Sequence, residues 1–250
     1  MAILPETHSA VTTPGIWARA ASGEFDSWYD LWAKTLASEM KLRAGKGLNP
    51  NVIVRVGWEH SDDRPWFSGP DPENFVKTFR KIVDMIREYN GKNNGLTTIA
   101  IDWRNLKRGQ QVDSILDHYP GSAYVDIISV DYYDCWPALN DDTIWNTQYL
   151  RTFRGGPWGI GKWLEFTKSE GKLFACPEWA IKVGSSKGLS KDIPYYIRKM
   201  YEFFKTNAQY IAYENYFNQK PIHQFAPPDL NPLAANEYLK WWGAAGTQPA

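Results

Sequence analysis

Two glutamates that each follow an apolar, strand-like run are the residues of this sequence best suited to chemistry. Glu59 ends the run VIVRVGWE, and Glu178 ends the run KLFACPE. A carboxylate buried beside the tryptophans that flank both positions costs free energy unless it is paired or used. Two carboxylates facing one pocket can hydrolyse a glycosidic bond, one as a protonated acid and one as an ionised nucleophile or base. The structural alternative is an ion pair with Arg55 or Arg104.

Short segments rich in β-branched and aromatic residues alternate with amphipathic segments along the chain. We expect strands at 51–57, 97–103, 125–132, 172–176 and 209–213, with 2–4 as a candidate sixth. We expect helices at 25–42, 72–89, 158–169, 193–205 and 233–242. Apolar strands that alternate with helices predict an α/β protein whose parallel sheet is covered on both faces. The candidates are a doubly wound sheet and a (β/α)8 barrel.

Two of the expected helices have clear apolar stripes. The first places Trp28, Leu31, Trp32 and Leu36 at helical spacing. The second opens with Asp71 as its N-cap and Pro72 in its first turn, followed by the stripe Phe75, Val76, Phe79, Ile82, Val83 and Ile86.

The position of the polar residues favours the barrel. A doubly wound nucleotide-binding sheet is expected to carry a glycine-rich turn after its first strand, and this sequence has none there. The glycine cluster GGPWGIG at 155–161 precedes a helix but follows no clear strand, so it is a weak phosphate-binding candidate. Polar and aromatic residues instead follow the strands, where a (β/α)8 barrel has its active site. The sequence therefore predicts a TIM-type barrel.

Composition limits the function classes. The 250 residues are 22% charged and 43% hydrophobic, which suits one barrel domain over 1–243 with a flexible tail at 244–250. The 28 basic and 28 acidic residues balance, which argues against a nucleic-acid partner. No apolar run of 18 residues occurs, so we expect no membrane association. The first 14 residues show no signal-peptide pattern, which leaves the compartment open.

Aromatic residues are the unusual component, with 13 Trp, 14 Tyr and 11 Phe. Flat rings that line a groove stack on sugars, although core packing explains many of them. The candidates for stacking are Trp58, Trp66, Phe67, Trp103, Trp136, Trp158 and Trp179. Among them Trp66 and Trp136 lie in loops that follow strands, which favours the groove. We expect Trp28, Trp32, Trp163, Trp241 and Trp242 to pack helices.

The remaining reactive side chains give no sign of a metal or cofactor. Cys135 and Cys176 are too few for a disulfide framework or a zinc site, and we expect both to be buried. His118 and His223 lack metal-ligand neighbours. His60 adjoins Glu59 and either shapes a sugar subsite or lies at the surface. We therefore predict no metal and no cofactor.

Five motifs in order resemble a known family, glycoside hydrolase family 26, which includes β-mannanases. They are Arg55-Val56-Gly57-Trp58-Glu59 with Trp66-Phe67, then 71–80, Trp103-Arg104-Asn105, the stretch 119–133, and Pro177-Glu178-Trp179. The resemblance extends from about Ile3 to Phe217 and implies a (β/α)8 barrel.

The resemblance also implies roles for individual residues. Glu59 corresponds to the general acid/base and Glu178 to the nucleophile of a retaining mechanism. Tyr133 is implied to hydrogen-bond Glu178, and Arg55 to support the strand end beneath the site. The resemblance adds Asn105 to the substrate-binding residues. Retention requires two carboxyl groups about 5–5.5 Å apart.

The sequence departs from the family pattern in three ways. Trp58 and Ser61 stand where the family has His and Asn, so mannan specificity does not follow. Asn105 follows Arg104 rather than proline. Residues 1–5 align with the third barrel strand, which implies a barrel without its first two strand–helix units. A partner or a preceding segment is then expected to complete it.

Taken together, these patterns predict a retaining endo-glycoside hydrolase acting on a β-linked polysaccharide. Mannan, mixed-linkage glucan and a microbial exopolysaccharide all remain open as substrates, and the resemblance suggests an extracellular or periplasmic location. The first alternative is a non-catalytic glycan-binding or polysaccharide-assembly barrel. The second is a (β/α) enzyme acting on a nucleoside or a phosphorylated sugar, against which the balanced charge and the missing phosphate loop argue.

Overall fold

The computed structural model describes residues 15–57, 59–61, 67–93, 95–106, 114–219, 223, 225 and 230–243. The chain divides into two compact units. Unit 1 comprises Met1–Ser129, Phe153–Gly156 and Ser169–Lys172, and unit 2 comprises Val130–Thr152, Pro157–Lys168 and Leu173–Ala250. The prediction of one domain over 1–243 stays a prediction.

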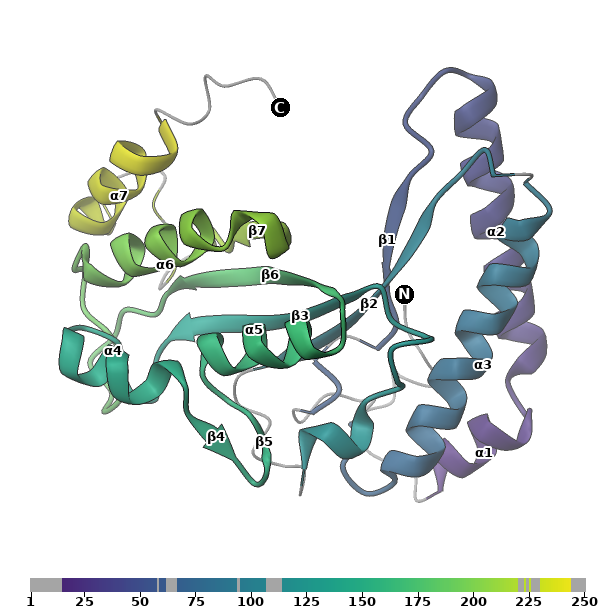
Figure 1. Cartoon of the computed structure of the whole chain (residues 1–250), viewed down its shortest axis with the longest axis horizontal. Coiled ribbons are helices and arrows are strands. Elements are labelled where there is room, and N and C mark those ends of the chain that lie inside the picture. The colour runs from purple at the N-terminus through teal and green to yellow at the C-terminus, as the bar shows by residue number, and fades with distance from the viewer. Residues whose placement is uncertain are drawn as a thin grey trace. The chain divides into compact units, whose positions relative to one another are not determined.

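Unit 1 contains three helices, two complete strands and the start of a third strand within its described part (Figure 1). In chain order they are α1 (Ile16–Ser22), α2 (Asp26–Gly45), β1 (Val52–Arg55), α3 (Pro72–Gly91), β2 (Ile99–Leu106), the 3-10 turn Ile115–His118 and the beginning of β3 (Ile127–Asp134). β1 and β2 pair in parallel with Arg55 opposite Asp102. The strand order is β1-β2-β3.

Helix α3 begins as the sequence predicts. The Asp71 carboxylate accepts a hydrogen bond from the backbone N–H of Asn74 at 3.3 Å, and Pro72 occupies the first turn. Such a cap satisfies one of the N–H groups that a helix start leaves without a partner. The buried face comprises Phe75, Thr78, Phe79, Ile82, Val83 and Ile86. α1 and α2 both pack against this helix.

Helix α2 buries a different face from the predicted one. The expected stripe included Leu31, which is 63% exposed, whereas Trp28, Trp32 and Leu36 are only partly buried. The buried residues are instead Tyr29, Ala33, Ala37 and Met40. Two alanines on this face let α2 approach α3 closely, so close packing rather than side-chain size decides which face is covered.

Unit 2 continues β3 and adds the remaining strands of the sheet, in the order β3-β6-β7. Its elements are α4 (Asp142–Tyr149), α5 (Ile160–Ser169), β6 (Leu173–Ile181), α6 (Tyr195–Thr206), the 3-10 turn Ala208–Tyr210, β7 (Ile211–Tyr216), α7 (Pro232–Tyr238) and the π-helical turn Leu239–Gly243. β6 and β7 are parallel. Figure 1 shows α6 alongside β6.

The five main strands of the prediction are confirmed, and the candidate strand at 2–4 lies outside the described residues. The five predicted helices are also confirmed, with α1 and α4 as additions. Two two-residue strands, β4 (Thr152–Phe153) and β5 (Gly156–Pro157), form a separate small sheet. In the described part of the chain, no helix combines the length and hydropathy of a membrane span.

The glycine cluster before α5 has a packing role. A Cβ atom on Gly159 would lie 2.0 Å from the backbone oxygen of Gln148, and one on Gly161 would lie 2.3 Å from the ring of Tyr149. Both distances are shorter than any real Cβ contact. The glycines therefore allow the start of α5 to approach the end of α4, which accounts for the cluster without a phosphate ligand.

Candidate active site

Glu59 lies in a tight turn two residues beyond Gly57, after β1 has ended. Its φ angle is 52°, a left-handed conformation that L-residues other than glycine, asparagine and aspartate seldom adopt. Its N–H donates to the backbone oxygen of Arg104 at 3.1 Å, which fixes the turn to β2. The side chain is 4% exposed. A buried carboxylate on a strained backbone is typical of a functional position.

His60 is buried beneath this turn and forms a hydrogen-bonded lock. Its Nε2 lies 3.2 Å from Oδ1 of Asn105, and its Nδ1 lies 2.9 Å from Oγ of Ser68. The Asn105 amide group donates to the backbone oxygens of Trp103 and Ser129, so its Oδ1 accepts from His60. The imidazole therefore carries its proton on Nε2, which leaves Nδ1 as an acceptor. The Ser68 hydroxyl lies within hydrogen-bond distance of both this Nδ1 and the backbone oxygen of His60, which is 3.0 Å away.

The environment keeps this imidazole neutral. Burial lowers the pKa of His60 well below its ordinary value, and the neighbouring His118 lowers the pKa further. The ring stacks on Phe75 with centroids 4.4 Å apart. The prediction left His60 open between a subsite and a plain surface residue, and the structure places it in the interior, where it holds the Glu59 turn.

Arg55, the last residue of β1, forms an ion pair with β2. Its Nε lies 3.5 Å from a carboxylate oxygen of Asp102, the residue opposite it in the neighbouring strand. Asp102 also accepts a hydrogen bond from the Ser129 hydroxyl at 2.5 Å. These side-chain contacts join β1, β2 and the beginning of β3 within unit 1.

Trp103 was predicted to stack on a sugar, and its position corrects that prediction. The side chain is fully buried in unit 1. Its ring packs against Tyr119 with centroids 4.9 Å apart and against His60 at 5.9 Å. Because protein covers the ring, Trp103 is a core residue that supports the His60 lock.

In unit 2, Glu178 lies within β6 and three residues before its end. The hydroxyl of Tyr133, on β3, donates to a carboxylate oxygen of Glu178 at 2.5 Å. The predicted hydrogen bond is confirmed. Tyr133 in turn packs against His223 and Phe217, with ring centroids 5.1 and 6.1 Å away. This hydrogen bond fixes the orientation of the Glu178 carboxylate relative to β3.

Trp179 follows Glu178 and so points to the opposite face of β6, because side chains alternate along a strand. It is fully buried. Its indole N–H donates to Glu214 at 2.5 Å, and Glu214 also accepts from the indole N–H of Trp242 at 3.0 Å. Rings from α6, β7 and α7 surround it. The stacking prediction for Trp179 is corrected to core packing.

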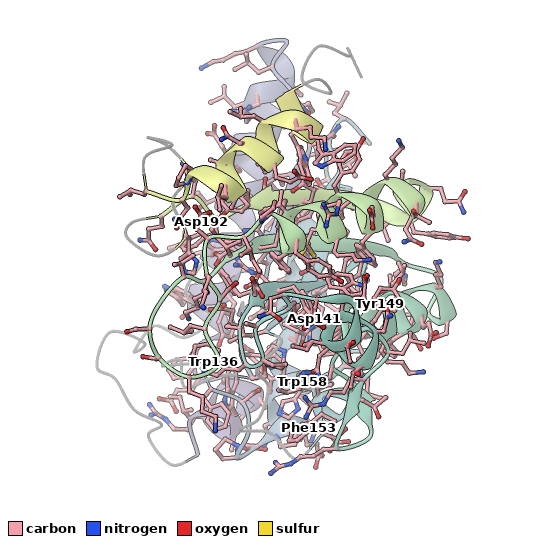
Figure 2. All side chains as sticks on the ribbon, turned by 90° about the vertical axis from the view of Figure 1, so that its left-hand side faces the viewer. Trp136, Asp141, Tyr149, Phe153, Trp158 and Asp192 are labelled. Carbon is pink, nitrogen blue, oxygen red and sulfur yellow. The ribbon has the colours of Figure 1, made fainter. Side chains whose placement is uncertain are left out.

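Trp136 lies in the loop after β3 and is half-buried. Figure 2 labels its side chain. The Nζ atom of Lys182 lies 4.5 Å from the centre of its ring and 5.9 Å from that of Tyr133. Among the predicted binding residues of unit 2, Trp136 and Tyr133 are partly accessible, whereas Trp179 is buried.

The sequence reasoning missed Lys182 and underrated His223. His223 is buried and donates its Nδ1–H to the backbone oxygen of Ile181 at 2.6 Å, and burial lowers its pKa. The sequence contains a signal for Lys182, which lies four residues beyond Glu178. Side chains at that spacing in an extended strand lie on the same face. Trp58 and Trp66 lie outside the described residues.

The cysteine prediction is confirmed. Cys135 and Cys176 are both buried and neither forms a disulfide. The Cys176 thiol faces the backbone oxygen of Val130 at 3.2 Å, which ties β6 to β3 within unit 2.

Comparison with known proteins bears on this arrangement. The family model described as glycosyl hydrolase family 26 matches residues 41–155, which include Glu59 and Tyr133. The predicted resemblance to family 26 is confirmed. A search of curated proteins finds no match.

Solved structures similar to the chain include family 26 proteins. The catalytic domain of the Bacillus sp. JAMB-750 family 26 endo-β-1,4-mannanase is 20% identical with a TM-score of 0.55, over 86% of this chain and 57% of that one. A modular endo-β-1,4-mannanase from Cellulomonas fimi is 19% identical with a TM-score of 0.62, over 95% and 50%. GH26C from Muricauda sp. MAR_2010_75 is 17% identical with a TM-score of 0.64, over 95% and 63%.

The chain thus spans 50% to 63% of the length of these family 26 structures. Their likeness to it establishes the fold. The strands and helices described above form an incomplete (β/α)8 barrel, as the sequence predicted.

Proposed function

We propose that this chain provides the two catalytic carboxylates of a retaining endo-glycoside hydrolase that acts on a β-linked polysaccharide. Glu178 attacks the anomeric carbon while Glu59 protonates the leaving oxygen. Glu59 then activates the water that releases the sugar from Glu178. The observation that carries the proposal is the hydrogen bond from Tyr133 to Glu178, within a chain that matches family 26.

The surroundings of each glutamate suit its proposed role. Glu178 is half-buried and accepts the Tyr133 hydroxyl, which orients its carboxylate for attack. Glu59 is almost fully buried, so the protein shields most of its carboxyl group from water. Its strained turn is held by β2 and by the His60 lock. Rigid support of this kind keeps a proton donor at one position relative to a bound sugar.

The test uses the purified chain and a panel of β-linked polysaccharides, with reducing ends as the readout. Glu178→Gln and Glu59→Ala are each expected to lower turnover by at least about a thousandfold, since each removes a group that acts in the chemical step. Glu165→Gln is the matched control, because Glu165 is an exposed residue of α5 that pairs with Lys162 of the same helix. Unchanged turnover in either glutamate variant removes that residue from the mechanism.

The stereochemical course is a separate readout. Retention predicts that the β-anomer is the first product seen by proton NMR, before mutarotation. The α-anomer as first product would replace the double displacement with a single inversion.

Glycan binding without cleavage is the second candidate. The observation that favours it is Trp58, which stands where the family resemblance expects a histidine directly before the proposed acid/base. An oligosaccharide that binds with no release of reducing ends would select this function.

A further inference from the structure

We propose that unit 2 contains a subsite for a sugar that carries a carboxylate, formed by Lys182 beside Trp136. The inference rests on the proposed function in taking the ligand to be a β-linked glycan, and it adds that the preferred glycan is acidic. The family 26 structures compared above include two endo-β-1,4-mannanases. Mannan is a neutral polymer, so a preference for an acidic glycan would distinguish this chain from those two mannanases.

Lys182 shares its surroundings with the proposed nucleophile. It follows β6 directly and lies four residues beyond Glu178. Tyr133 contacts both residues: its hydroxyl donates to Glu178 at 2.5 Å, and its ring centre lies 5.9 Å from the Lys182 ammonium. A sugar bound at Glu178 would therefore lie near the positive charge of Lys182, because Tyr133 contacts both residues.

The Lys182 ammonium is available to an anion. No carboxylate among the described residues forms an ion pair with Lys182, and this residue is half-buried. Its contacts are the rings of Trp136 and Tyr133. A cation held on aromatic rings keeps its N–H donors for a ligand, and a carboxylate is the partner that best matches them.

The loop 182–191 fixes this arrangement. The N–H of Trp136 donates to the oxygen of Gly188 at 2.8 Å, and the N–H of Ser190 donates to the oxygen of Lys182 at 2.9 Å. Gly188 has a φ of +88°, and a Cβ atom there would lie 2.7 Å from Trp136. In Figure 2 the loop is the pale green trace beside Trp136 that rises to Asp192. The lysine is therefore preorganised before any ligand arrives.

The charge of the loop agrees with an acidic ligand. Its sequence, KVGSSKGLSK, contains three lysines and no acid. Lys187 and Lys191 are exposed. They add a positive potential that salt screens, whereas Lys182 is the half-buried group placed for direct contact.

The experiment compares two ligands that differ only at C6. One is a β-1,4-linked mannuronan hexasaccharide, and the other is the same oligosaccharide after carboxyl reduction, which is mannohexaose. Binding is measured by calorimetry with the Glu59→Gln chain, which retains Glu178 and its charge, at 50 and 300 mM NaCl. We expect the acidic ligand to bind about tenfold more tightly at low salt, since a charge-assisted hydrogen bond is gained. The advantage is expected to shrink at high salt.

Variants of the loop test whether Lys182 causes the preference for the acidic ligand. Lys182→Met is expected to remove the tenfold preference for the acidic ligand, and Lys182→Arg to keep most of it. Lys187→Met is the matched control, because it makes the same change of charge on the same loop at an exposed position, and the preference should stay within twofold. Circular dichroism and thermal unfolding establish that each variant is folded. Equal binding of both ligands overturns the inference, as does a preference that survives Lys182→Met or is lost equally with Lys187→Met.

Hydrolysis assays with the unaltered chain separate the two proposals. If mannohexaose is cleaved but binds as well as the acidic ligand, the inference fails and the hydrolase stands. If the acidic ligand binds through Lys182 and neither ligand is cleaved, the inference stands and the hydrolase proposal fails. Absence of binding by both ligands overturns the inference.

Discussion

Replacing His60 by phenylalanine tests the buried lock beneath the Glu59 turn. The substitution keeps a ring to stack on Phe75 but removes both side-chain hydrogen bonds. Ser68 retains its bond to the backbone oxygen of residue 60, whereas the buried Oδ1 of Asn105 is left without its donor. One lost neutral hydrogen bond with its unsatisfied partner costs about 2 kcal/mol of unfolding free energy. That is the difference we expect at pH 7.5.

The difference should vanish on acidification. The pKa of His60 is lowered on folding, so the unfolded chain binds the proton more tightly. Stability is therefore fully present above the unfolded pKa of about 6.5 and falls as the pH drops below it, by about 1.4 kcal/mol per pH unit. Over about 1.5 units, from pH 6.5 to 5.0, the unaltered chain loses about 2 kcal/mol through His60. The phenylalanine variant has no such loss, so the two curves should meet near pH 5.

Urea unfolding followed by tryptophan fluorescence and far-UV circular dichroism, at half-unit steps from pH 5 to 7.5, measures the difference. Asp71→Ala is the control: it removes the α3 cap, costs about 1 kcal/mol, and its effect should not change over this range. A His60→Phe difference that stays constant from pH 7.5 to 5 would refute the claim that the imidazole is kept neutral in the fold.

Three further outcomes follow from the geometry. Glu59→Gly is expected to be about 1 kcal/mol more stable than Glu59→Ala in urea unfolding, because glycine adopts a φ of 52° without strain; equal stabilities would argue against the left-handed turn. Glu214→Leu leaves the buried indole N–H of Trp179 without its acceptor, so we expect the unfolding free energy to fall by about 2 kcal/mol. For a chain of this size that loss corresponds to a melting temperature about 4–8 °C lower. An unchanged melting temperature would contradict the core assignment of Trp179. Gly188→Ala forces a methyl group against Trp136 and should weaken binding of the mannuronan hexasaccharide about as much as Lys182→Met, with unaltered affinity as the contrary result.

The strand positions and the helix starts could be predicted because local signals decide them. Buried parallel strands are apolar throughout, and the Asp71-Pro72 pair marks the start of α3 without reference to the rest of the chain. The hydrogen bond from Tyr133 to Glu178 could be anticipated from the family resemblance alone. Nothing in the spacing of two residues 45 positions apart indicates such contact.

The tryptophans were harder to place, because the sequence does not say which face of a strand meets helices. Trp179 and Trp103 both stand near strand ends beside candidate site residues, yet each points into a core. The faces of α2 were misjudged for a related reason. Trp28 and Leu31 are larger than Ala33, but the closeness of α3 favours the smaller side chain. Helical periodicity shows which faces of a helix are apolar, whereas the neighbouring helix determines which of those faces is buried.

The loop that carries Lys182 is anchored at both ends by atoms that do not depend on its central side chains. Backbone groups of Lys182, Gly184 and Ser190 bond to one another, and just beyond the loop the Asp192 carboxylate accepts the N–H groups of Leu233 and Ala234 at the start of α7. Residues 185–187 between these anchors are exposed. Natural variation or a randomised library at these three positions could therefore exchange their charge with little loss of folded protein, which makes this segment a place where such a protein could diversify toward new polymers.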